Sequence, residues 1–64
     1  MSGTILFFNE SRKYGFIRDD IGEEHFFHIS GFKNGILPSG TAVVFELSTF
    51  RGQPVACQIE KLKV

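Results

Sequence analysis

The 64-residue sequence has one cysteine, two prolines and no tryptophan, and its seven basic residues are balanced by seven acidic ones. The single cysteine, Cys57, excludes an internal disulfide framework and suits a reducing compartment. No apolar run approaches the roughly 18 residues that a membrane-spanning helix needs, and no charged-then-apolar leader opens the chain. We therefore expect a cytoplasmic protein that makes no contact with membranes.

The net charge of zero bears on the kind of partner. A dedicated nucleic-acid binder is usually basic, because much of its affinity comes from contacts to phosphate. In this chain the two signs of charge are separated along the sequence. Basic residues lie in or near the aromatic stretches and the loops, at Arg12, Lys13, Arg18, Lys33 and Arg51. Acidic residues crowd into one short run, at Asp19, Asp20, Glu23 and Glu24. This pattern allows a locally positive face on a neutral molecule.

Two short aromatic stretches, residues 13–17 and 25–29, are separated by a polar, turn-rich run. If both stretches are strands, every second side chain lies on the same face. The run between them suits the turn of an antiparallel hairpin. One face of that hairpin carries Tyr14, Phe16, Arg18, Phe26 and His28. The other face carries Ile17, Phe27 and Ile29 and is expected to enter a core.

Three further segments have the alternation or the β-branched content of strands: residues 3–8, 41–48 and 54–62. In residues 41–48 the alternation places Val43, Phe45 and Leu47 inward. In residues 54–62 it places Val55, Cys57 and Ile59 inward and Ala56, Gln58 and Glu60 outward. Residues 30–40 are glycine-rich, lack periodicity and are expected to form a long surface loop.

Five strands without a convincing helix predict a single all-β domain over residues 1–64, because a chain of this length cannot hold a second domain. Five short strands leave sheet edges that must be protected. A closed or nearly closed antiparallel barrel is the arrangement that protects them.

Several motifs recur along the chain in a fixed order. They are Phe7-Phe8-Asn9, Tyr14-Gly15-Phe16-Ile17 and Phe26-Phe27-His28, followed by Gly40, Val43, Phe45, Arg51-Gly52, Pro54 and Ala56. This series resembles the cold-shock domain family, whose corresponding motifs are Trp-Phe-Asn, Phe-Gly-Phe-Ile and Phe-Val-His. The resemblance covers nearly the whole chain. It implies a five-stranded antiparallel OB-type barrel that binds single-stranded nucleic acid.

Position by position, the resemblance places base-stacking residues at Phe7, Tyr14, Phe16, Phe26 and His28. It places cations that contact the nucleic-acid backbone at Arg12 and Arg51. Lys13 and Arg18 lie close to the aromatic face in sequence and are expected to contact phosphates as well. Phe32 and Phe50 are candidates for additional stacking, although Phe50 fits equally well as a packing contact within a hairpin.

The chain departs from the family pattern at several of these positions. Leu6 replaces a common lysine, and Phe7 replaces the tryptophan. Lys13 replaces the glycine that usually precedes the first aromatic motif, and Ile29 replaces the aromatic residue after the histidine. These departures predict the same binding mode with lower or altered affinity.

The function that the resemblance implies is that of an RNA chaperone, which captures unpaired RNA or DNA by base stacking with little sequence preference. It would act as a monomer, without a cofactor and without a small-molecule substrate. The main alternative is a protein–protein interaction module on a small barrel, with nucleic-acid binding weak or lost. Another is that the aromatic residues pack an unusually aromatic core.

Catalysis and metal binding have less support in the sequence. The carboxylates cluster in one exposed turn, and no serine or cysteine has a plausible base beside it. His25 and His28 are three residues apart, so on a regular strand they point to opposite faces and cannot hold one metal ion. We therefore expect neither an enzyme nor a metal site.

Overall fold

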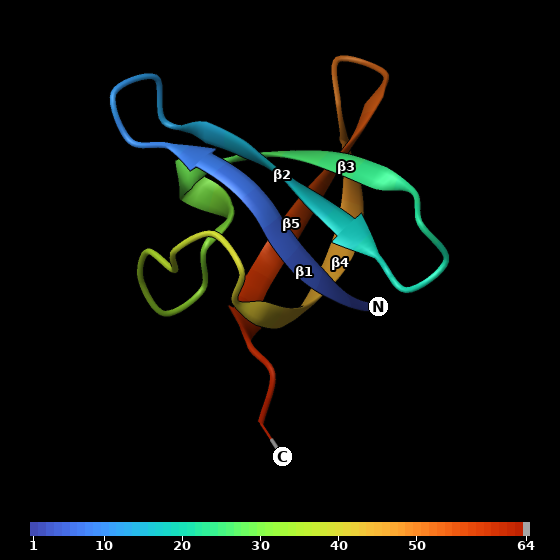
Figure 1. Ribbon diagram of the computed structural model, residues 1–64. Helices are drawn as coiled ribbons and strands as arrows, with labels where there is room; N and C mark the ends of the chain where they lie inside the picture. The colour runs from blue at the N-terminus through green and yellow to red at the C-terminus, as the bar shows by residue number, and fades with distance from the viewer. Residues whose placement is uncertain (64) are drawn as a thin grey trace.

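The structure is a computed structural model that describes residues 1–63 (Figure 1). Within these residues it contains five strands and one short 3₁₀ turn. The strands are β1 (Ser2–Asn9), β2 (Tyr14–Asp19), β3 (Glu24–His28), β4 (Ala42–Phe50) and β5 (Gln53–Lys61), and the turn is η1 (Ile29–Gly31). The predicted all-β fold with five antiparallel strands is confirmed.

The strands form one sheet in the order β3-β2-β1-β4-β5. The sheet curls, so that β1, β2 and β3 cross in front of β4 and β5 in Figure 1 and the two edge strands, β3 and β5, come into contact. Among the described residues no ladder joins β3 to β5, although Phe32, just after η1, bridges to Ile59 of β5. The barrel is therefore open along the seam between β3 and β5.

Two bulges interrupt the regular alternation of the strands. In β1, Ile5 pairs with Ile17 and Phe7 pairs with Phe16, which leaves Leu6 as an extra residue. In the second bulge, Val44 of β4 pairs with Glu60 and Glu46 pairs with Cys57. One residue of β4 therefore lies opposite two residues of β5, so β5 carries the extra residue. A bulge bends a strand and re-aims the side chains that follow it.

The core lies between the two layers of the curled sheet and is formed by Ile5, Ile17, Phe27, Val43, Phe45, Ala56 and Ile59. The predicted inward faces of Ile17 and Phe27 are confirmed, since both side chains are fully buried. Gly15 faces the same way, where a Cβ atom would clash with the carbonyl oxygen of Phe7 and lie 2.7 Å from Cζ of Phe27. Only glycine fits at this position, between two residues that face outward.

The prediction for the last strand is wrong in part. Ala56, expected to face outward, is buried, whereas Val55 and Cys57 are only half-buried. The bulge explains the difference, because Gln58 adopts a φ of 52° and so allows Ala56 and Ile59, three residues apart, both to face the core.

Two further expectations need correction. Leu47 is 41% exposed, because the β4–β5 hairpin continues beyond the barrel and its tip projects past β3 (Figure 1). Ile29 lies in η1 and not in a strand, and it is half-buried. The chain turns at this point because the backbone N–H of Ser30 donates a hydrogen bond to Nδ1 of His28.

Candidate nucleic-acid interface

Five ring-bearing residues share the outer surface of β1, β2 and β3, and we call them the aromatic platform: Phe7, Tyr14, Phe16, Phe26 and His28. Strand pairing sets them in two rows. Phe7 pairs with Phe16 and Phe16 with Phe26, which makes one row across three neighbouring strands. Tyr14 pairs with His28 in the second row. The structure thus brings together all five residues that the sequence proposed for base stacking.

The platform rings contact one another edge to face or face to face. The centroids of Phe7 and Tyr14 are 5.6 Å apart, and those of Phe16 and Phe26 are 5.9 Å apart, both with steeply inclined planes. Tyr14 and Phe26 are stacked at 5.9 Å with their planes 20° apart. Aromatic pairs at such distances are mutually attractive, which holds the rings in place.

The platform is a surface and not a second core. Phe26 is 39% exposed, whereas the adjacent Phe27 is completely buried, and Phe7 is 38% exposed. His28 is exposed, and Tyr14 and Phe16 are half-buried by their neighbours. Strand alternation produces this contrast, since the inward positions of β2 and β3 already supply the core.

Three further phenylalanines, Phe8, Phe32 and Phe50, lie in two different settings. Phe8 faces inward, stacked 5.8 Å from Phe27, as its sequence position next to Phe7 requires. Phe32 also packs against this inner group, 5.2 Å from Phe27 and 5.3 Å from Phe8, so its ring supports the core. Phe50 is 63% exposed at the end of β4, with the guanidinium of Arg51 5.4 Å from its ring centroid.

The four proposed phosphate-binding cations lie around the platform in two different situations. Arg12 and Lys13 lie exposed in the β1–β2 loop, and Arg51 lies exposed in the β4–β5 turn. Arg18 is different, because it pairs with Glu24 at 3.2 Å on the neighbouring strand. Both partners are about half exposed, so the contact is weak and leaves Arg18 accessible.

Lys13 and Arg51 also adopt an unusual backbone conformation. Their φ angles are 62° and 53°, in the left-handed region that favours glycine. At Lys13 a glycine would adopt this conformation without strain, so the lysine places a cation here together with backbone strain. The strain amounts to about 1 kcal/mol.

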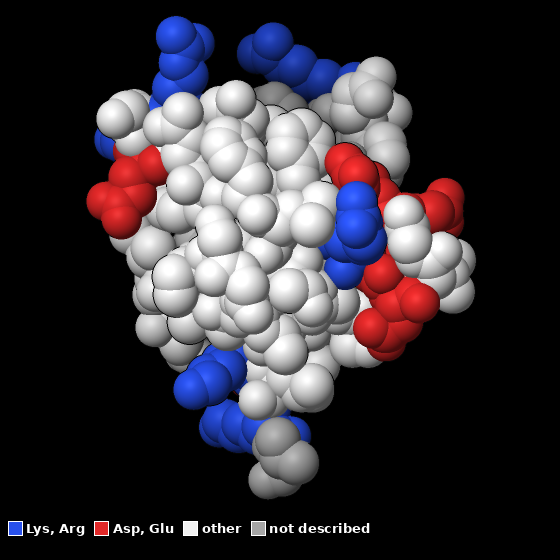
Figure 2. Space-filling model, viewed as in Figure 1, with Lys and Arg blue, Asp and Glu red and all other residues white. Residues whose placement is uncertain are grey.

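The charges are distributed unevenly around the platform. Figure 2 shows a broad uncharged surface over β1, β2 and β3, with acidic side chains gathered at the β2–β3 turn. Lys and Arg side chains project along the top of this view, over the β1–β2 loop and beside the tip of the β4–β5 hairpin, and one further acidic group lies beside the β1–β2 loop. The local separation of charge predicted from the sequence is therefore present in the fold.

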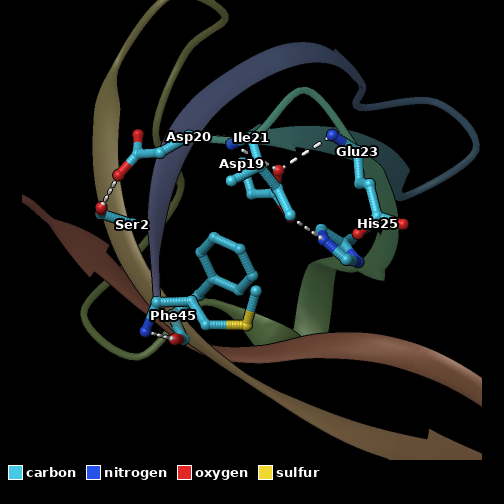
Figure 3. A network of polar contacts seen from close by, with 8 residues as sticks. Ser2, Asp19, Asp20, Ile21, Glu23, His25 and Phe45 are labelled. Atoms are coloured by element: carbon cyan, nitrogen blue, oxygen red, sulfur yellow. Dashed lines mark hydrogen bonds and ion pairs between the residues drawn. The ribbon is translucent and has the colours of Figure 1, made fainter.

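Asp19 organises the acidic turn, as Figure 3 shows. Its carboxylate accepts hydrogen bonds from the backbone N–H groups of Ile21 (3.1 Å) and Glu23 (2.9 Å), and its second oxygen lies 2.7 Å from Nε2 of His25. The hydrogen bond with His25 lowers the pKa of Asp19 below its ordinary value of 3.8, and the two N–H groups lower this pKa further, whereas burial opposes the shift. The sequence predicted an exposed turn here, but the side chain at its start, Asp19, is only 6% exposed.

Sequence reasoning missed three features of this surface. The bulge at Leu6 turns that side chain outward beside Phe7, with 38% of its surface exposed. Val55 and Cys57 face the seam beside β3, together with residues of the platform. His25 joins the turn to the core by bonding Asp19. Of these three features, only the contact between His25 and Asp19 could have been predicted from the sequence. The histidine follows the aspartate by six residues, with a predicted turn between them.

Residues 1–63 contain neither a cluster of metal-ligating side chains nor a membrane-spanning helix. In residues 1–63 no three His, Cys, Asp or Glu side chains lie close enough together to hold a metal ion. His25 is half-buried against Phe45, whereas His28 is exposed, so the two imidazoles do lie on opposite faces. No helix within the described part of the chain has the length and apolar character needed to cross a membrane.

A five-stranded, partly open barrel that displays aromatic rings on β2 and β3 and cations in the β1–β2 and β4–β5 loops has the architecture of the OB-type class of domains. The chain matches the family model of the "Cold-shock" DNA-binding domain over residues 1–62. The protein therefore belongs to the cold-shock domain family. Its members bind nucleic acid and are not enzymes.

Proposed function

We propose that this protein binds single-stranded RNA or DNA by stacking bases on the aromatic platform, and that it acts as an RNA chaperone. The observation that carries this proposal is the row formed by Phe7, Phe16 and Phe26 across three strands. Each ring offers a π surface to any base, and such stacking contributes about 1–3 kcal/mol per base with little sequence preference. We further propose that residues 1–64 act as one domain and as a monomer. Cytoplasmic location stays a prediction.

The shape of the platform favours unpaired strands. Its rings lie on a continuous sheet surface, where bases can stack only after they have left the interior of a duplex. Binding the unpaired form alone shifts the equilibrium of an RNA hairpin toward the open strand. Chaperone activity then needs no reaction and no cofactor.

The distribution of charge favours one part of the platform for the bound strand. Arg12 and Lys13 supply positive charge in the β1–β2 loop, at the end of β2 away from the acidic turn, and Arg51 supplies it in the β4–β5 turn. Phosphates are attracted to these cations and repelled by the acidic turn, so the strand should leave the platform before it reaches the turn. With two to four phosphate contacts, the logarithm of affinity should fall by roughly 0.7 per contact for each tenfold rise in salt.

The experiment that tests this proposal is fluorescence anisotropy of a labelled seven-base pyrimidine strand, titrated with the protein at two salt concentrations. A matching duplex serves as the control. We expect micromolar or tighter binding to the single strand, weaker at the higher salt, and no comparable binding to the duplex. Equal binding to both forms would contradict stacking, and no binding to either would favour the interaction-module alternative.

A further inference from the structure

A groove adjoins the aromatic platform along the open seam between β3 and β5. Phe26 and His28 line it from β3, and Phe50, Val55 and Cys57 line it from the β4–β5 hairpin. Its volume is about 480 Å³, which is within the range of pockets that hold small organic molecules. Two of these residues, Phe26 and His28, also belong to the platform, so the groove continues the same surface.

The fold produces this groove in two ways. No ladder joins β3 to β5 within residues 1–63, and the surface is hollowed between the side chains of the two strands. Because Ala56 faces the core, its neighbours Val55 and Cys57 are turned toward that hollow. The hairpin then carries Phe50 beyond the barrel to form the outer end of the groove, with 63% of its surface exposed.

The groove has few polar groups, and a hydrogen bond from the backbone fixes the orientation of the imidazole ring of His28. The backbone N–H of Ser30 donates to Nδ1 of His28 at 3.1 Å, so Nδ1 is the acceptor and the proton of the neutral ring lies on Nε2. That Nε2–H group has no hydrogen-bond partner among the described residues and can donate to a ligand. The guanidinium of Arg51, beside the ring of Phe50, adds a positive charge at the outer end.

We propose that this groove takes one further unpaired nucleobase from the strand that crosses the platform. Phe50 would stack on that base, and Arg51 would contact the phosphate attached to it. A base has flat apolar faces for Phe50 and Val55, acceptor atoms at its edge for Nε2–H of His28, and a neighbouring phosphate for Arg51. This inference rests on the proposed function, because it makes the groove an extension of the platform.

The test is a comparison of the wild type with Phe50→Ala on a set of seven-base pyrimidine strands, each with an abasic residue at a different position. On the intact strand, Phe50→Ala should weaken binding by about 5- to 150-fold, as the loss of one stacked base implies. At one position the abasic residue should weaken wild-type binding by a similar factor and leave Phe50→Ala unaffected. This lack of additivity identifies the base that occupies the groove.

Two controls keep the result specific. Ile21→Ala removes another highly exposed apolar side chain, in the acidic turn, and should bind every strand as the wild type does. The single cysteine, Cys57, provides a second measurement on the wild type alone. The intact strand should slow its reaction with a thiol reagent, whereas the strand lacking the coupled base should not.

The outcomes separate the two proposals. If the wild type binds the intact strand, Phe50→Ala binds it equally well and Cys57 stays unprotected, the groove inference is overturned and the platform remains. If the wild type binds no single strand, the proposed function itself has failed and the groove inference fails with it. Protection of Cys57 by a strand that lacks bases entirely would also overturn the inference, since it would show contact without base recognition.

Discussion

Phe26 and Phe27 are adjacent residues of the same type on the same strand, yet they lie in opposite environments. Phe27 is completely buried among the residues of the core, whereas Phe26 is 39% exposed in a row of rings on the outside of the sheet. The inner face of β2 and β3 therefore serves stability, and the outer face is free to serve binding. Successive side chains of a strand point in opposite directions. Two short strands of a small barrel can therefore use one face for the core and the other face for binding.

The same comparison explains why the outer face is aromatic. Exposed large apolar side chains lose the free energy that burial would give, so a cluster of them on a monomer's surface marks a site of interaction. Here the cluster crosses three strands in register, the arrangement on which the proposed base stacking rests. The inner face needs no such order, because packing requires only volume and shape.

The largest effect on stability is expected at the inner face. Phe27→Ala should lower the free energy of unfolding by about 3–5 kcal/mol, because it removes a fully buried ring and leaves a cavity beside Phe8. A domain of this size has a stability of only a few kcal/mol, so this variant should lose its cooperative thermal transition in circular dichroism. Ile21→Ala is the control and should melt as the wild type does; a cooperative transition in Phe27→Ala near that of the wild type would contradict the assignment.

Substitution of the neighbouring Phe26 should weaken nucleic-acid binding more than it lowers stability. Phe26→Ala should weaken binding of the seven-base strand by about 1–3 kcal/mol, because one stacking ring is lost. Its effect on the free energy of unfolding should be about 1 kcal/mol or less, since it removes only surface ring pairs. Chemical denaturation and anisotropy on the same preparation measure both quantities. A large loss of stability with unchanged binding would reverse the roles of the two faces.

Two substitutions of Lys13, at the edge of the platform, separate the effect of backbone strain on stability from the effect of charge on binding. Lys13→Gly should raise the free energy of unfolding by about 1 kcal/mol, because glycine adopts a φ of 62° without strain. Lys13→Ala removes the same charge and retains the strain, so it should not be stabilised. If Lys13 contacts a phosphate, both variants should reduce the salt slope by roughly 0.7, as measured by anisotropy. A slope unchanged in both would remove Lys13 from the binding surface.

The smallest effect in this series concerns the acidic turn and depends on pH. The folded state holds the pKa of Asp19 below 3.8, so the unfolded state binds more protons in the acid range. The resulting stabilisation is fully present above about pH 3.8 and is lost as the pH falls through the lower pKa of the folded state. Denaturation curves at a series of acidic pH values should show this loss in the wild type and in Asp20→Asn. The dependence should be weaker in Asp19→Asn; an identical dependence there would assign it to other groups.

The sequence was sufficient for the features that follow from local alternation. The opposite faces of Phe26 and Phe27 follow from the two-residue period of a strand, and the number of strands follows from the placement of turn-forming residues. The role of Gly15 is also consistent with its place between two outward rings. These features depend on nearest neighbours, which the sequence displays directly.

The features that the sequence did not predict depend on long-range pairing. The bulges at Leu6 and Gln58 arise where one strand meets a partner with one residue fewer, and nothing in either segment alone indicates them. The bulge at Gln58 decides which residues of β5 enter the core and so helps to create the groove beside β3. The burial of Asp19 likewise depends on His25 across the turn and on the core beneath it.

The most direct test of the division between the two faces is an aromatic ¹³C–¹H correlation spectrum of the protein, titrated with the seven-base strand. Stacked bases change the ring signals that they cover. We expect the signals of Phe7, Tyr14, Phe16 and Phe26 to shift progressively with added strand, while those of Phe8 and Phe27 stay in place. Shifts confined to the inner rings, or spread equally over both sets, would contradict the assignment of the outer face to binding.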